Sequence, residues 1–158
     1  MQTFLTIFSG VIIFVVGQIT VKMVIEPVQE MKKTIEKIKT EVHRNSFEIH
    51  NCSVIGESSK KETIDILRNL SAELIAHIEL VSFYKISSSI FNLPDKIKIT
   101  NAFQNLISIA NLMNIPTHTK TADHAYELIL KNIEELKINL NISLVTGYEM
   151  ESKKIEIE

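Results

Sequence analysis

The chain has 158 residues, of which 45% are hydrophobic, and its formal net charge is −2. This length supports one modest domain plus an additional element, and the net charge argues neither for nor against a strongly charged partner. Only 4 glycines and 3 prolines interrupt the chain, so the composition favours long helices over many short strands. The single cysteine, Cys52, excludes an intramolecular disulfide.

The first segment is almost entirely apolar, and no charged residue occurs over Met1–Val21. A helix of about 20 apolar residues crosses a bilayer. A secretory signal peptide would have basic residues before its apolar run and a small-residue cleavage site after it, and this segment has neither. If this segment were a core helix, it would need protein packed against every face, and the remaining chain is too short to provide that. The sequence therefore predicts a retained transmembrane anchor over residues 1–25.

The distribution of basic residues predicts how this anchor is oriented. None precedes the apolar run, whereas five lysines follow it closely, namely Lys22, Lys32, Lys33, Lys37 and Lys39. By the positive-inside rule, the N-terminus lies outside and the rest of the chain lies in the cytoplasm. We therefore expect a single-pass protein of a bacterial inner membrane, with the lipid bilayer as a partner.

An apolar stripe continues from the anchor into the segment after Pro27, which either starts a second helix or kinks a continuous one. Glycines seven residues apart let helix backbones approach closely within a membrane. We therefore expect a homo-oligomer that forms through this stripe and the heptads after it, although packing within the chain's own domain explains the second half equally well. Alternating steps of three and four residues give Thr3, Ile7, Gly10, Phe14, Gly17, Val21, Val24, Val28, Met31, Ile35, Ile38 and Val42.

A second set of residues, Gln18, Lys22 and Glu26, is spaced by four and shares one helical face at the cytoplasmic end of the anchor. Polar groups at this depth are costly unless they are paired, reach the interface or face water. In an oligomer they are candidates for lining a pore, with Lys22 paired to Glu26 of a neighbouring copy. The alternative is that Lys22 simply extends to the membrane surface.

The remaining chain predicts an all-α fold, in which the anchor continues into a cytoplasmic bundle of about four amphipathic helices over residues 26–142. The tail, residues 143–158, ends in the alternating sequence KIEIE and is either frayed or a weak strand. The first predicted bundle helix covers residues 28–50, and the second is opened by the capping-box pattern of Ser59–Glu62. The third covers about 95–113 and the fourth about 122–140. Between the second and third helices we expect a break, with room for one short turn, over Lys85–Asp95.

The segment RNSFEIH, Arg44–His50, resembles the R-x4-6-H motif of HEPN-family ribonucleases. This resemblance implies that Arg44 binds phosphate and that His50 assists attack by the ribose 2′-hydroxyl, in a site shared by two protomers. RNA would then be a partner; otherwise no nucleic acid is expected, because no basic face is evident. A solvated helix end is the alternative interpretation.

Other signals of chemistry are weak. The five histidines are not spaced with carboxylates in a pattern that suggests a designed metal site, and Cys52 has only His50 near it as an activating group. No glycine-rich phosphate loop or nucleophile elbow is present in the sequence. We therefore expect no cofactor and no metal, and a protein that is not an enzyme unless the ribonuclease interpretation holds.

Three segments resemble a group of small bacterial single-pass proteins without an assigned activity: GQITVKMVIEPVQEMKKTIEKI, LRNLSAELIAHIELVSFY and AFQNLISIANLM. With its single span and helical domain, the chain is also similar in architecture to the HEPN-like membrane-pore accessory protein of RNA-targeting CRISPR systems. This similarity implies an oligomeric, pore-forming membrane effector in antiviral defence. The alternatives are a membrane-tethered HEPN-like ribonuclease and a passive tether or scaffold for a cytoplasmic protein partner.

Overall fold

A computed structural model describes residues 2–52, 54–115 and 124–144 in full, and the backbone of 121–123. The described residues form helices and no strand, which confirms the predicted all-α fold with an apolar N-terminal helix and a helical bundle. In chain order the elements are α1 (Gln2–Thr20), a π-helical turn (Val21–Ile25), α2 (Glu26–Arg44), α3 (Ser46–His50), α4 (Glu57–Leu80), α5 (Tyr84–Phe91), α6 (Lys96–Met113) and α7 (Thr121–Leu140).

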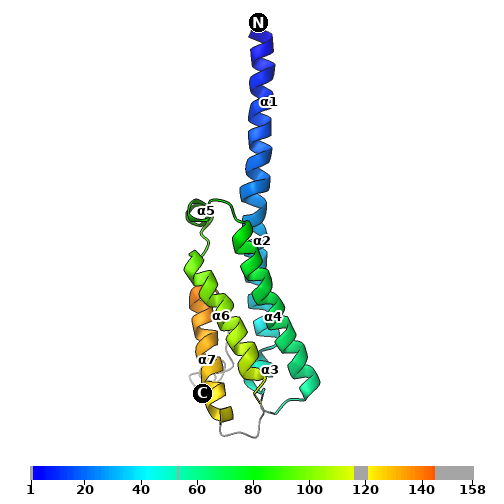
Figure 1. Ribbon diagram of the computed structural model, residues 1–158, viewed down its shortest axis with the longest axis vertical. Helices are drawn as coiled ribbons and strands as arrows, with labels where there is room; N and C mark the ends of the chain where they lie inside the picture. Colours follow the sequence, from blue (N-terminus) through cyan, green and yellow to red (C-terminus); the bar gives the residue numbers. More distant parts are fainter. Residues whose placement is uncertain (1, 53, 116–120, 145–158) are drawn as a thin grey trace, which may run out of the picture.

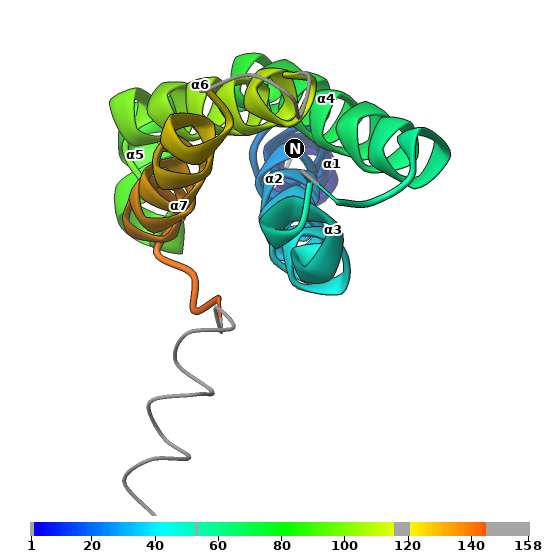
Figure 2. The same cartoon turned by 90° about the horizontal axis from the view of Figure 1, so that it is seen from below.

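The bundle is a row of four long helices, and α1 projects from it alone (Figure 1). Helix α4 packs against both α2 and α6, and α6 packs against α7. Seen from below, the row is curved, so that α2 and α7 stand on the same side of it (Figure 2). The short helix α3 lies at the end of the bundle farthest from α1, whereas α5 lies at the end from which α1 emerges (Figure 1).

The N-terminal helix is continuous with α2, and together they form one helix of 43 residues over Gln2–Arg44. No residue of α1 is buried, so within the described chain α1 is not a core helix. It is long and apolar enough to span a membrane. Helices α4 and α5, bent by 107° at their junction, meet the same criterion only when taken together, but α4 buries one face in the bundle.

The core is built from the apolar stripes that the sequence predicts. On α2, positions three and four residues apart turn inward, because this spacing places them on one face of an α-helix. The same holds on α4, where Ile64, Leu67, Leu70, Leu74, Ile78 and, just after the helix, Val81 are all buried. The buried members of the predicted stripes on α6 and α7 are Ile99, Leu106, Ala110, Ile129, Ile133, Leu136 and Leu140.

Two predicted helix boundaries are wrong for local reasons. The helix predicted over residues 28–50 breaks at Asn45, whose side-chain Nδ2 donates to the carbonyl of Glu41 at 2.8 Å and so competes with the helical ladder. The predicted capping box over Ser59–Glu62 lies inside α4, which begins at Glu57 after an extended Gly56. Here Lys60 extends the buried stripe, and its amine donates to the carbonyl of Ile115 at 3.4 Å.

The predicted break over Lys85–Asp95 is also wrong in part, because seven of the eight residues of helix α5 lie within it. Three consecutive serines give this segment poor helix propensity. The helix forms because Tyr84 and Phe91 pack against the core and Ser87 is buried between them. Helix α6 starts after Asp95 and ends at Met113, as predicted.

The C-terminal prediction is tested only over its first residues. Leu144 is buried with the core and Ile142 packs against it, so the packed structure extends to residue 144. The remainder of the predicted tail, residues 145–158, lies outside the described residues, as does most of the loop predicted before α7. Helix α7 itself begins at Thr121 and matches the predicted helix of about 122–140.

Leu74→Ala provides a test of this core, because Leu74 is fully buried on α4 between α2 and α6. We expect the free energy of unfolding to fall by about 2–5 kcal/mol, through lost apolar burial and a residual cavity. Denaturant unfolding of the full chain in detergent, followed by circular dichroism, measures this loss. Ile138→Ala, on the exposed surface of α7, is the matched control and is expected to change stability by less than about 0.5 kcal/mol.

Candidate functional site around the π-helical turn

A π-helical turn over Val21–Ile25 joins α1 to α2, and Pro27 is the second residue of α2. Proline lacks a backbone N–H, and in an α-helix its ring clashes with the carbonyl four residues earlier, here that of Met23. The wider turn relieves this clash, and Glu26 donates its backbone N–H to the carbonyl of Val21, five residues back. Pro27 therefore neither starts a separate helix nor breaks the continuous helix over Gln2–Arg44, but widens one turn of it.

The wide turn breaks the continuity of the predicted stripe from α1 into α2. An i→i+5 turn accommodates one more residue than an α-turn, so the faces on its two sides are offset by about 100°. Gly17 and Val28, eleven residues apart, would nearly coincide on a regular helix but face different directions here. The sequence prediction of one unbroken stripe is therefore wrong, because a turn of different pitch separates its halves.

The same offset brings the polar residues closer to one face. Gln18 and Glu26 would be about 80° apart on a regular α-helix and are only about 20° apart across the wide turn. Lys22 lies between them within the turn, and all three side chains are exposed. Gln18 and Lys22 line one shallow surface groove together with Phe14. The structure thus brings the candidate pore-lining residues together on the surface of a single chain.

The candidate self-association residues on α1 face open space. A Cβ built on Gly10 or Gly17 meets no atom within 4 Å, and Phe14 and Val21 are exposed. Glycine in a helix interior costs about 1 kcal/mol relative to alanine, through conformational entropy. No contact within the described chain requires a glycine at either position. This surface is therefore available to another helix.

The heptad positions after the π-helical turn are not exposed and cannot contact another copy of the chain. The side chains of this half of the stripe are packed inside the bundle, so the prediction that these heptads mediate self-association is wrong for the folded chain. The alternative interpretation, packing within the chain's own domain, is confirmed for this part. The residues concerned are Val28, Met31, Ile35, Ile38 and Val42.

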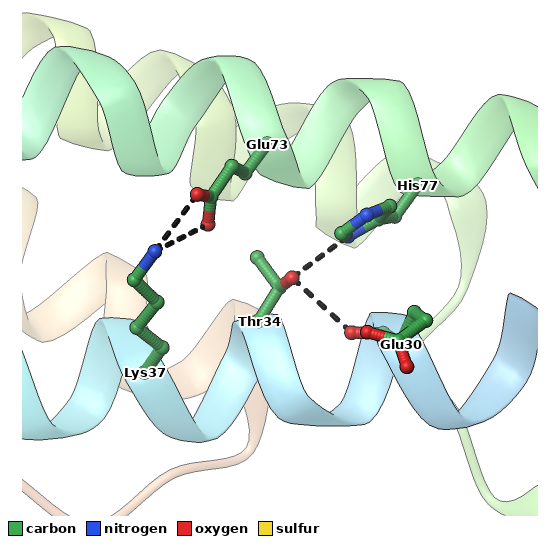
Figure 3. A network of polar contacts seen from close by, with 5 residues as sticks. All are labelled: Glu30, Thr34, Lys37, Glu73 and His77. Carbon is green, nitrogen blue, oxygen red and sulfur yellow. Dashed lines mark hydrogen bonds and ion pairs between the residues drawn. The ribbon is translucent and has the colours of Figure 1, made fainter.

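Polar contacts fasten α2 to α4 along the edge of this packed face (Figure 3). The Lys37 amine lies 2.8 Å and 3.0 Å from the two carboxylate oxygens of Glu73. One turn closer to α1, the hydroxyl of Thr34 lies 2.7 Å from Nδ1 of His77 and donates to the carbonyl of Glu30 at 3.2 Å. Thr34 is buried, whereas Lys37 and Glu73 are largely exposed, so the threonine contact is the better shielded from water.

The direction of the hydrogen bond between Thr34 and His77 depends on the tautomer of His77. Nδ1 donates to the hydroxyl oxygen when it carries the ring proton, and it accepts from the hydroxyl when it does not. In the first case the hydroxyl proton is left for the Glu30 carbonyl. The Glu30 side chain, meanwhile, accepts a bond from Lys33 at 2.6 Å, and this bond with the lysine charge lowers the pKa of Glu30.

The structure does not bring Arg44 and His50 together within one chain. Arg44 ends α2, pairs with Glu41 at 2.9 Å and lines a cleft between α2 and α4. His50 ends α3 and lines a different, small cavity beside α7, where its ring stacks edge-on with that of Tyr126. Its Nδ1 contacts the carbonyl of Ser46 at 2.6 Å, and its Nε2 is buried without a hydrogen-bond partner among the described residues.

The remaining candidates show little reactive chemistry. Burial raises the pKa of Cys52 and the nearby Lys60 charge only partly offsets this, so the thiol is poorly nucleophilic. Over the described ranges, no three His, Cys, Asp or Glu side chains gather into a metal site. His43 and His124 are exposed, and His118 lies outside the described residues.

A polar cluster between α6 and α7 was missed from the sequence. The buried Asn105 donates to Asn132 at 3.1 Å and to Glu135 at 2.9 Å, and it accepts from Asn139 at 3.2 Å. These side chains line a surface cleft of about 570 Å³ that is rich in amides. The signal in the sequence that could have revealed this cluster is Asn105, a single asparagine on the apolar face of α6. Because its amide group is hydrogen-bonded within the chain, the cluster sets how α6 and α7 align.

In comparisons with known proteins, no family model, no curated protein and no solved structure gave a significant match to this chain.

Thr34→Val tests the contact between α2 and α4, because it keeps the shape of the side chain and removes only the hydroxyl. We expect the free energy of unfolding to fall by about 0.5–2 kcal/mol, since the His77 ring loses its partner. Lys37→Met removes the exposed pair with Glu73 and is expected to cost less than about 1 kcal/mol. Denaturant unfolding in detergent compares the stability of the two variants. A larger loss in Lys37→Met than in Thr34→Val would contradict the conclusion that the Thr34 contact is the better shielded of the two.

Proposed function

We propose that this chain is a single-pass protein of a bacterial inner membrane and acts there as an oligomeric membrane effector. The observation that carries the proposal is α1, in which every described side chain is exposed and none is charged. Nineteen helical residues extend about 28 Å, which matches a hydrocarbon core of about 30 Å. Transfer of this apolar surface from water into lipid is favourable and drives the insertion of α1 into the membrane.

In this proposal the bundle lies in the cytoplasm. Lys22 and the lysines of α2 follow the apolar run, and Lys32, Lys33 and Lys37 are exposed, as the positive-inside rule favours for a cytoplasmic side. The N-terminus then lies on the outer side. The remaining polar surface of the bundle needs no lipid contact.

Self-association through α1 is supported by the open glycine surface. Gly10 and Gly17 lie seven residues apart and have no contact within the described chain that requires a glycine. In a bilayer, small residues let two helices pack backbone to backbone, which replaces lost van der Waals contacts. Phe14 lies between the glycines on the same face and Val21 continues it.

The polar face supports a pore more specifically than it supports a plain anchor. Gln18, Lys22 and Glu26 come close to one face across the wide turn, and none of their side chains bonds to a described residue of the bundle. In an assembly they line the axis, with Lys22 of one copy next to Glu26 of another. An effector of this kind fits the role in antiviral defence that the architectural resemblance implies.

The alternative functions have less support from the geometry. A HEPN-like site would need Arg44 and His50 from different protomers to meet, because within one chain they line different cavities. A passive tether for a cytoplasmic partner requires no assembly of α1, and it is the interpretation that a monomeric protein would favour.

The mass of the full-length protein in mild detergent tests the assembly. We expect a discrete oligomer for the natural sequence and a loss of at least about tenfold in association for Gly10→Leu/Gly17→Leu, equivalent to about 1.4 kcal/mol. Because a side chain at either position meets no atom of the same chain, any loss reflects contacts between copies.

Leu5→Phe/Val16→Phe is the matched control, because these positions lie on the side of α1 that faces away from both Gln18 and the glycines. It should leave the mass unchanged. A monomer for the natural sequence would contradict both the oligomer and the pore, and the tether would then be the better conclusion.

Ion flux through reconstituted vesicles tests the polar face. We expect Lys22→Glu to shift the preference between chloride and potassium toward potassium, because a ring of charged side chains sets the selectivity of a pore. Lys61→Glu makes the same charge change at the start of α4, far from the turn, and should have no effect. Equal selectivity in the two variants would rule out a lining role for Lys22.

A further inference from the structure

A group of exposed apolar side chains surrounds the bend between α4 and α5. Phe83 is 75% exposed and Ile90 is 70% exposed, and Leu80 and Ile86 are exposed to a similar degree. Contact with water is unfavourable for all four, and no described residue covers them. The apolar residues of α5 that face the bundle, Tyr84 and Phe91 among them, are instead half-buried against the core.

The position of α5 relates this surface to α1. Helix α5 lies at the end of the bundle from which α1 emerges, level with the junction of α1 and α2 (Figure 1). It is seen end-on in that view, whereas α1 is seen along its length, so the axis of α5 runs across the axis of α1. The view from below agrees, since α5 extends there across the end of the bundle (Figure 2).

The bend is held in a strained conformation. Phe83 adopts a left-handed backbone conformation with φ of 52°, which is unfavourable for a bulky side chain. Two hydrogen bonds close the turn, from the Ile86 N–H to the Phe83 carbonyl at 2.8 Å and from the Ser87 hydroxyl to the Ser82 carbonyl at 3.0 Å. These hydrogen bonds hold Phe83 in this conformation, in which its ring lies on the surface.

The other side of α5 is fixed to the bundle. The Tyr84 hydroxyl donates to the Pro94 carbonyl at 2.6 Å. Burial, with a smaller effect from the Asp95 charge, raises the pKa of Tyr84 to about 12, so this hydroxyl stays a donor even at pH values where an exposed tyrosine ionises. Ser87 is buried beneath the helix. Helix α5 is thus attached to the bundle through Tyr84, Ser87 and Phe91.

We infer that α5 is an interfacial helix, which lies in the headgroup region of the same bilayer that α1 crosses and buries Phe83, Ile86 and Ile90 in it. The inference rests on the proposed anchoring by α1, since that fixes where the membrane surface lies. A short helix with apolar and cationic residues on its exposed surface binds in this way. An aromatic ring at the interface is also typical of membrane proteins.

The charges around α5 fit a lipid surface. Lys85 is exposed on α5 itself, and Lys96 and Lys98 are exposed at the start of α6, which lies next to α5 in Figure 1. Lysines close to a membrane are attracted to anionic headgroups, while their aliphatic stems contact the acyl boundary. The bundle would therefore contact the membrane at two places, the emerging helix and α5.

Tryptophan fluorescence tests this directly, because the chain contains no tryptophan. Ile90→Trp places a single reporter on α5, and Ile86→Trp repeats the test at a second exposed position. The full chain is reconstituted into vesicles of phosphatidylcholine and phosphatidylglycerol whose acyl chains are brominated either near the headgroup or near the chain end. Ile13→Trp, within α1, reports whether the anchor crosses the bilayer. Val54→Trp, 79% exposed between α3 and α4, is the matched control at the far end of the bundle.

We expect bromine near the headgroup to quench Ile90→Trp and Ile86→Trp, bromine deep in the bilayer to quench Ile13→Trp, and neither to quench Val54→Trp. Quenching of Ile13→Trp without quenching of either α5 variant would overturn the inference and leave the anchor intact. A blue-shifted but unquenched α5 reporter would also overturn it, because protein would then cover this surface. No quenching of Ile13→Trp would instead contradict the proposed anchoring itself.

Discussion

The organisation of this protein depends on one constraint, that α2 is both the continuation of α1 and a member of the bundle core. Val28 and Val42 lie near opposite ends of the buried stripe of α2, and both are packed against the other helices. Burial of such side chains contributes about 1.5–3 kcal/mol each, far more than the exposed pair between Lys37 and Glu73. The direction in which α1 leaves the bundle is therefore set by core packing and cannot change without disturbing it.

The π-helical turn then decides which residues of α1 face which way relative to the bundle. A regular helix would carry the glycine surface into the core face of α2, whereas the wide turn caused by Pro27 separates the two. The outer part of the helix is thereby left with an apolar surface of its own and a polar edge at Lys22. In the proposed assembly, packing within the chain and association between chains use different faces of one helix, so neither has to be lost for the other to form.

Much of the fold followed from the sequence, because helix-spaced apolar residues such as Leu67, Leu74 and Ile78 have one stable arrangement, facing a common core. Features that depend on single atoms did not follow. The break at Asn45 needs a side chain to take a helical carbonyl, and the contact of Thr34 with His77 joins residues 43 positions apart. The polar face of the candidate site was visible as a spacing of four, but its alignment depends on a turn whose pitch the sequence does not reveal.

The attachment of α5 and α1 to one bundle has a further consequence, which concerns membrane thickness. In the proposed arrangement the fold sets the height between the middle of α1 and α5, and the bilayer has to match this height. A thicker or thinner hydrocarbon layer must tilt α1, thin or thicken the lipid around it, or move α5 out of the headgroup region, each at a fraction of a kcal/mol per Å. Such a protein therefore senses the length of the lipid chains. It accumulates in the membrane whose thickness suits both the span of α1 and the position of α5.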